Sequence, residues 1–273
     1  MLPSLDAATS GLDQFQQEIN VIANNIANVD TVGFKSANIN FEDTMSMTLG
    51  SNAAGSMQVG TGVTTASIAN QFTQGTISSN GVPTDLAVDG NGFFLVKDPT
   101  SGNLYATRDG DFKVDSNGYL VTSTGERVQG YTDSTDATVG DIQITNAGAP
   151  NGDTSTFESC TFDSSGNVNI LLADGTQYKG GQVLLQNFSD PGQLMNAGNN
   201  LFTGLSLAGP LPAPVAPGSN GLGTLATSSL EMSNVDLSDQ LSSLIVAQRA
   251  YEANAKVVTT SDEILQDVTN LKR

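Results

Sequence analysis

The chain has 273 residues, of which 28 are acidic and ten are basic, so its formal net charge is −18. This charge disfavours nucleic acids and anionic membrane surfaces as partners, and no apolar run reaches the length of a membrane span. The sequence has no His, no Trp and a single Cys, which excludes a disulfide framework and the usual zinc ligand sets.

The first thirty residues predict an amphipathic helix. Apolar side chains recur at alternating spacings of three and four, which places them on one seam. The seam consists of Leu5, Ala8, Leu12, Phe15, Ile19, Ile22, Ile26 and Val29. The helix is expected to end near residues 28–33, because Asn and Gly tolerate the left-handed conformation that terminates helices. This periodic start lacks a basic region and a continuous apolar core, so a cleavable signal peptide is not expected.

The middle of the chain predicts β-structure with short turns. The Gly-, Ser- and Asn-rich stretch 50–56 predicts a loop, and an alternating pattern begins at about Val59. Hairpins are expected around residues 89–92, 109–110, 115–118 and 174–175, where Asp, Asn and Gly supply turn chemistry. Residues 132–165 form either a small appended piece or a long loop.

Residues 237–271 predict a second amphipathic helix, with Asp236 as its N-cap. Its apolar stripe consists of Leu237, Leu241, Leu244, Tyr251, Ala255, Val258 and Leu265. The expected fold class is α+β, in which the terminal helices pair as a coiled-coil-like stalk around a central, mainly antiparallel β-domain. The expected order is an N-terminal helix (1–34), a connector (35–70), the β-domain (71–208), a Pro- and Gly-rich linker (209–232) and a C-terminal helix (233–273).

No catalytic, cofactor-binding or metal site is expected, and the chain is not expected to be an enzyme. Four oxygen donors lie close in sequence, namely Asp109, Asp111, Asp115 and Asn117, but their spacing fits hairpin turns better than a calcium loop. Cys160 has no His to activate it and is expected to be a buried structural residue. A carboxylate pair for glycoside hydrolysis stays open as an alternative.

A helix pair made only of the two chain ends buries little apolar surface, so further copies are expected to complete it in a helical polymer. The side chains expected in this assembly seam are Leu5, Leu12, Phe15, Ile19, Ile22, Ile26, Leu237, Leu241, Leu244, Tyr251, Val258 and Leu265. The alternative, from a different functional class, is a secreted β-rich binding protein or carbohydrate-active enzyme whose end helices clamp it shut.

Linked motifs in the sequence resemble those of bacterial flagellar rod and hook proteins. They are residues 22–28 with 31–35, residues 72–77 with 85–94, residues 107–110 with 118–121, and residues 230–237 with 248–254. The residues that carry the terminal motifs are Asn24, Asn25, Asn28, Thr31, Gly33, Phe34, Lys35, Asn234, Gln248 and Arg249.

The resemblance implies a subunit that polymerises into a helical tube and leaves the cell through the flagellar export route, without a cleaved signal peptide. The implied partners are further copies, other axial proteins (rod, hook cap and hook–filament junction), export machinery and chaperones, with no nucleic acid and no membrane insertion. Residues 34–36, 40–43 and 128–131 favour a hook subunit, which transmits torque from motor to filament. A distal rod subunit is the alternative, since only residues 132–165 fill the position of the hook's outer domain.

Overall fold

The computed structural model describes residues 3–52, 55–132, 138–144, 157–211 and 214–271. The chain divides into two compact units. The helical unit comprises residues 1–29, 36–71 and 235–273, and the β unit comprises residues 30–35 and 72–234. Helices at both ends and antiparallel strands between them confirm the α+β class.

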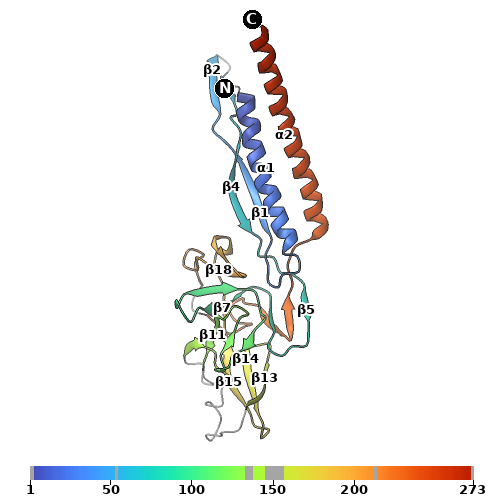
Figure 1. Cartoon of the computed structure of the whole chain (residues 1–273). Helices are drawn as coiled ribbons and strands as arrows, with labels where there is room; N and C mark the ends of the chain where they lie inside the picture. Colours follow the sequence, from blue (N-terminus) through green and yellow to red (C-terminus); the bar gives the residue numbers. More distant parts are fainter. Residues whose placement is uncertain (1–2, 53–54, 133–137, 145–156, 212–213, 272–273) are drawn as a thin grey trace. The chain divides into compact units, whose positions relative to one another are not determined.

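The helical unit is built on two long helices, α1 (Pro3–Ala27) and α2 (Leu237–Leu271), which lie side by side (Figure 1). They run antiparallel, because Gly11 packs against Asn254 while Asn25 bonds to Gln240 at the other end of the pair. Helix α2 begins as predicted, since the Asp236 carboxylate accepts a hydrogen bond from the Ser238 amide at 2.8 Å. Neither helix combines the length and apolarity needed to cross a membrane, as far as the structure describes them.

Two β-ribbons complete the helical unit. Strand β1 (Ala37–Asp43) pairs with β4 (Val63–Asn70), and β2 (Met47–Asn52) pairs with β3 (Gly55–Val59). Helix α1 contacts the first ribbon through an edge-to-face pair of Phe15 and Phe41, with ring centroids 6.0 Å apart. The prediction of a loop over residues 50–56 is wrong for residues 50–52 and 55–56, which pair in β2 and β3, while residues 53–54 lie outside the described part.

In the described residues, the β unit consists of short strands and a 3-10 turn. They are β5 (Ile77–Ser79), β6 (Leu86–Asp89), β7 (Phe93–Lys97), β8 (Leu104–Thr107), β9 (Lys113–Val114), β10 (Leu120–Val121), β11 (Arg127–Tyr131), β12 (Val139–Asp141), β13 (Phe157–Phe162), β14 (Asn167–Leu172), β15 (Gln177–Val183), β16 (Leu185–Gln186), η3 (Pro191–Gln193), β17 (Met195–Gly198), β18 (Leu201–Thr203), β19 (Thr224–Thr227) and β20 (Ser229–Glu231). The main path of the large sheet runs β13-β14-β15-β11-β7-β8-β18-β17, and β6–β19 and β5–β20 form separate pairs.

Two of the four predicted hairpins are confirmed. Strand β9 pairs with β10 across residues 115–118, and β14 pairs with β15 across residues 173–176. The hairpins predicted around residues 89–92 and 109–110 are wrong, because β6 pairs with β19 and β8 pairs with β7 and β18. Gly90 and Gly92 have φ values of 113° and 132°, which glycine adopts readily because it has no Cβ.

The expected linker, residues 209–232, belongs to the β unit. Its last residues form β19 and β20, and Pro210 and Val215 make isolated bridges to Phe188 and Leu185. Proline has no amide hydrogen to donate to a strand ladder, so a proline-rich composition predicts a linker. In this segment, residues at both ends are nevertheless paired with strands. Segment 132–165 contributes β12 and β13 to the sheet, while residues 133–137 and 145–156 lie outside the described part.

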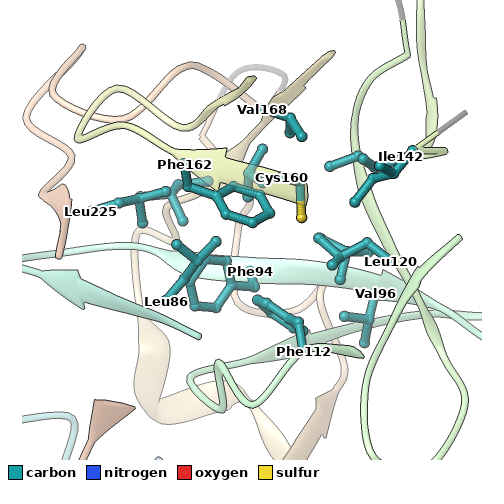
Figure 2. Close-up of a cluster of buried hydrophobic side chains, with 14 of the residues drawn as sticks. Leu86, Phe94, Val96, Phe112, Leu120, Ile142, Cys160, Phe162, Val168 and Leu225 are labelled. Atoms are coloured by element: carbon teal, nitrogen blue, oxygen red, sulfur yellow. The ribbon is translucent and has the colours of Figure 1, made fainter. Parts of the chain in front are cut away.

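The main core of the β unit gathers aliphatic and aromatic side chains from strands across the sheet (Figure 2). Phe94 and Phe112 meet edge to face in it, with ring centroids 5.1 Å apart. Cys160 is buried in this cluster, with its sulfur directed into it (Figure 2). Burial raises the pKa of the Cys160 thiol, as expected for a structural rather than a reactive cysteine.

Candidate assembly site

The α1 part of the predicted seam is turned inward within one copy. Ile22 is buried, and the other five side chains are half-buried, namely Leu5, Leu12, Phe15, Ile19 and Ile26. Helix α1 contacts α2 and the β1–β4 ribbon. The α1 stripe therefore finds much of its apolar cover inside the helical unit.

Asn25 fixes three elements of the helical unit together. Its side chain is buried, donates to the Ala37 carbonyl at 2.9 Å and accepts from the Ala37 amide at 3.0 Å, as a neighbouring strand would. It also donates to the Gln240 side-chain oxygen at 3.0 Å. Asn25 thereby aligns α1 with both β1 and α2. These hydrogen bonds also offset the free-energy cost of burying a polar amide group.

The α2 part of the predicted seam divides between two faces. Leu244 and Val258 are half-buried, but Leu237, Leu241, Tyr251 and Leu265 are exposed. The line of α2 that is most covered instead carries small and polar residues, namely Gln240, Ala247, Asn254 and Ser261. They recur every seven residues, which is the spacing of a helix seam. Within one copy, the close packing of α2 thus uses small side chains, while the predicted seam between copies stays a prediction.

A second apolar stripe on α2 is mostly exposed to solvent in one copy. We call it the outer stripe; it comprises Val246, Ala250, Ala253, Val257, Ile264 and Leu271, which fall on heptad spacing. Four of them are prominent: Val246 is 68% exposed, Val257 41%, Ile264 60% and Leu271 87%. The sequence-based interpretation missed this stripe, although its four-and-three spacing could have revealed it.

The motif residues Gln248 and Arg249 are also exposed on α2, where Arg249 pairs with Glu252 at 2.8 Å.

The other terminal motif residues are tied to backbone and side-chain groups nearby. The Asn28 side chain donates to the Asn24 carbonyl at 2.9 Å, which satisfies the end of α1. The Asn234 side chain donates to the Thr73 hydroxyl at 2.8 Å within the β unit. Thr31 belongs to the β unit, where its carbonyl accepts from the Phe34 amide at 3.3 Å.

In the β unit, Gly33 brings the N-terminal motif against the C-terminal strand. Its amide donates to the Glu231 carbonyl at 2.7 Å. Gly33 has φ +67°, and an added Cβ would lie 2.7 Å from the Asp109 amide nitrogen. Only glycine fits this left-handed, crowded position. The next residue, Phe34, is buried.

A buried charge cluster lies in the β unit and joins three segments that are far apart in sequence. We call Lys35, Arg108 and Glu231 the chain-end cluster. The Lys35 ammonium lies 2.6 Å from one Glu231 carboxylate oxygen, and the Arg108 guanidinium lies 3.2 Å from the other. The side chains of Lys35 and Glu231 are 0% exposed and that of Arg108 is 3% exposed. Glu231 also accepts from the Gly75 amide at 2.9 Å. The Glu231 carboxylate thus forms ion pairs with both Lys35 and Arg108.

Burial opposes the charge of both cations in this cluster. It lowers the pKa of Lys35 and of Arg108, and the nearby Glu231 carboxylate partly offsets this effect. Lys35 donates further to the Thr73 carbonyl at 2.8 Å, and Arg108 donates to the Gly90 carbonyl at 3.0 Å. The Arg108 guanidinium also lies 5.0 Å from the centre of the Phe93 ring, although its Nε has no hydrogen-bond partner among the described residues. No local pattern in the sequence pointed to this cluster, because its neighbouring members are 73 and 123 residues apart along the chain.

The acidic turns act as local caps. The Asp109 carboxylate accepts from the Asp111 amide at 3.1 Å, and the Asp115 carboxylate accepts from the Asn117 amide. Burial raises the pKa of Asp109. Within the part of the chain that the structure describes, no group of three or more His, Cys, Asp or Glu residues is arranged to hold a metal ion.

Three segments of the chain match known families. Residues 5–35 match the flagella basal body rod protein family, residues 87–170 match the D1 domain of flagellar hook protein FlgE/F/G, and residues 226–271 match the C-terminal part of the flagellar basal body rod FlgEFG proteins. The three members of the chain-end cluster each lie in a different one of these segments.

Individual relatives match over the whole chain. The basal-body rod protein FlgG of Bacillus subtilis is 39% identical over 281 residues, and the match covers all of both chains. FlgG of Caulobacter vibrioides is 35% identical over 283 residues, covering 99% of this chain and all of the relative. The hook protein FlgE of Borreliella burgdorferi is 26% identical over 444 residues, covering all of both chains. The chain belongs to the family of bacterial flagellar rod and hook proteins, and it is a structural subunit of the flagellar axis.

Proposed function

We propose that this chain is a distal rod subunit of the flagellar basal body. The supporting observation is the length of the alignments together with the sequence identity. The two rod proteins align over about as many residues as the chain contains, at 35–39% identity. The hook protein needs an alignment of 444 residues and reaches only 26% identity. The favoured sequence interpretation, a hook subunit, is therefore less well supported than its alternative.

The residues of the helical unit support polymerisation as the activity. The outer stripe leaves apolar side chains without cover in one copy, although a surface helix of a globular protein normally packs its apolar face against the core. Burying the four prominent members against neighbouring copies would stabilise each contact by a few kcal/mol, at about 25 cal/mol per Å² of apolar surface. We assign the exposed members of the predicted seam, Leu237, Leu241, Tyr251 and Leu265, to the same inter-copy contacts.

The β unit has a different part in this proposal. Its chain-end cluster fastens residues 33–35, which follow α1, and β20, which precedes α2, within the β unit. Such an anchor would carry torsional load from the helical tube to the β unit. The proposed partners are further copies, other axial proteins of the rod, hook cap and hook–filament junction, and the machinery and chaperones of the flagellar export route.

Deletion of the gene in its own bacterium separates rod from hook. Loss of a distal rod subunit leaves basal bodies that end in a short stub and carry no hook, seen by electron microscopy of purified basal bodies. Loss of a hook subunit leaves a complete rod that ends where the hook should begin. Complete rods in the deletion strain would contradict the proposal, and re-expression of the wild-type chain must restore both structures.

A further inference from the structure

The helical unit contains a small cavity with an unpaired carboxylate. It has a volume of about 250 Å³ and is lined by Glu18 and Ile22 of α1, Asn38 and Asn40 of β1, and Gln240 and Ser243 of α2. This volume holds several water molecules or one long side chain. Its mouth is open to solvent, because Asn38, Asn40 and Ser243 are exposed.

Glu18 lies half-buried in this cavity without an ion pair or side-chain hydrogen bond to any described residue. Burial raises the pKa of Glu18. A desolvated carboxylate is stabilised when a cation enters beside it. The amide oxygens of Asn38 and Asn40 provide further acceptors at the mouth, so the cavity is suited to an ammonium group.

The helical unit offers few cations that could fill the cavity. Among the described residues of the helical unit, Arg249 and Lys256 are the basic ones. Arg249 is already paired with Glu252, whereas the exposed Lys256 ammonium has no ion pair among the described residues.

Lys256 of the same copy does not reach Glu18. The Gly11–Asn254 and Asn25–Gln240 contacts put Glu18 level with about residue 247 of α2. Lys256 is then about nine residues farther along the helix, which is about 13 Å at 1.5 Å per residue. This offset exceeds the length of a lysine side chain.

We propose that the Glu18 cavity receives the Lys256 side chain of a second copy. Charge complementarity identifies this occupant: each copy carries a net charge of −18, so neighbouring copies repel one another until a specific cation contact opposes the repulsion. Every copy presents both the cavity and the lysine, which allows the contact to repeat from copy to copy without closing. This inference rests on the proposed polymerisation and names one contact within it.

Charge reversal in separate copies tests the pair. Glu18→Lys and Lys256→Glu are purified as full-length chains, and polymer is measured by sedimentation at concentrations where the wild-type chain polymerises. Each variant alone is expected to raise the critical concentration by at least about tenfold, which is the scale of losing one modest ion contact. Circular dichroism of each monomer checks that its helices still form.

An equimolar mixture of the two variants distinguishes an intermolecular pair from an intramolecular one. In the mixture, the lysine that Glu18→Lys introduces in one copy meets the glutamate that Lys256→Glu introduces in the next. Within each single variant the two positions carry like charges and stay repulsive, so polymer is expected to return only in the mixture. The control is Asp13→Lys, which makes a matching change at an exposed α1 position outside the cavity.

Two results would overturn the inference while leaving the proposed function intact. One is a mixture that fails to polymerise although the wild-type chain does. The other is an equal rescue of Asp13→Lys by Lys256→Glu, which would indicate a general charge effect. A wild-type chain that never polymerises would contradict the proposed function itself, and the inference with it.

Discussion

Neutralising Glu231 should destabilise the β unit strongly. Glu231→Gln keeps the size of the side chain and an oxygen that can accept from the Gly75 amide, but it removes the carboxylate that pairs with both Lys35 and Arg108. Two buried cations then lose their counter-charge. Removing one partner of a buried ion pair costs about 3–5 kcal/mol, which corresponds to a fall in melting temperature of roughly 6–20 °C for a unit of this size.

The same charges predict an order of effects. The cluster has one negative and two positive members, so Lys35→Met leaves a balanced pair of Arg108 and Glu231. Lys35→Met is therefore expected to cost less than Glu231→Gln, although it also loses the bond to the Thr73 carbonyl. As a control, Lys113→Gln breaks an exposed pair with Asp111 at 3.5 Å, and exposed pairs contribute less than about 1 kcal/mol.

Urea unfolding of the full-length monomer measures these differences. The chain has no Trp and five Tyr residues, of which only Tyr251 lies outside the β unit, so tyrosine fluorescence follows that unit. Circular dichroism at about 222 nm follows the helices separately, since helices dominate that signal. The charge account is refuted if Glu231→Gln costs less than about 1 kcal/mol, or if Lys35→Met costs as much or more.

Three further substitutions probe other contacts. Gly33→Ala should cost at least about 1–2 kcal/mol in the same urea assay, and more than Gly102→Ala, which has a similar φ of +73° but open space for a Cβ; equal costs would argue against the close approach to the Asp109 amide. Asp109→Asn should raise the melting temperature at about pH 7 but not near pH 3. The reason is that the pKa of Asp109 is raised in the folded state, so the folded protein favours the protonated carboxyl and loses stability as the pH rises through that pKa. A lower melting temperature of Asp109→Asn at neutral pH would contradict this. Asn25→Ala should destabilise the helical unit by about 1–3 kcal/mol, which would lower the melting temperature in the helical dichroism signal. Asn20→Ala, at an exposed position, is the control. An equal effect of the two substitutions would reject the role of Asn25.

Much of the fold could be predicted from local pattern. The ends of α1 and α2 followed from helix periodicity and from capping by Asp236, both of which act within a few residues. The turns at residues 115–118 and 174–175 were likewise local, because their Asp, Asn and Gly residues fit hairpins directly.

Other features depended on partners distant in sequence. Strand β6 has turn residues on its C-terminal side, yet it pairs with β19, which lies more than 130 residues away. Local pattern also could not show that Glu231 meets Lys35 and Arg108, because charged residues are usually exposed and burial of this trio depends on the whole sheet. On α2, small residues such as Ala247 and Ser261 occupy the covered line, so a search for large apolar side chains selected positions that stay exposed.

Negative-stain electron microscopy of the purified full-length chain, at rising concentration, tests polymerisation through the outer stripe most directly. The wild-type chain should form straight rods, and Val257→Asp should remain monomeric with its tyrosine fluorescence unchanged, because a charge in the outer stripe opposes burial between copies. A wild-type chain that stays monomeric at high concentration, or a Val257→Asp variant that forms normal rods, would contradict the account.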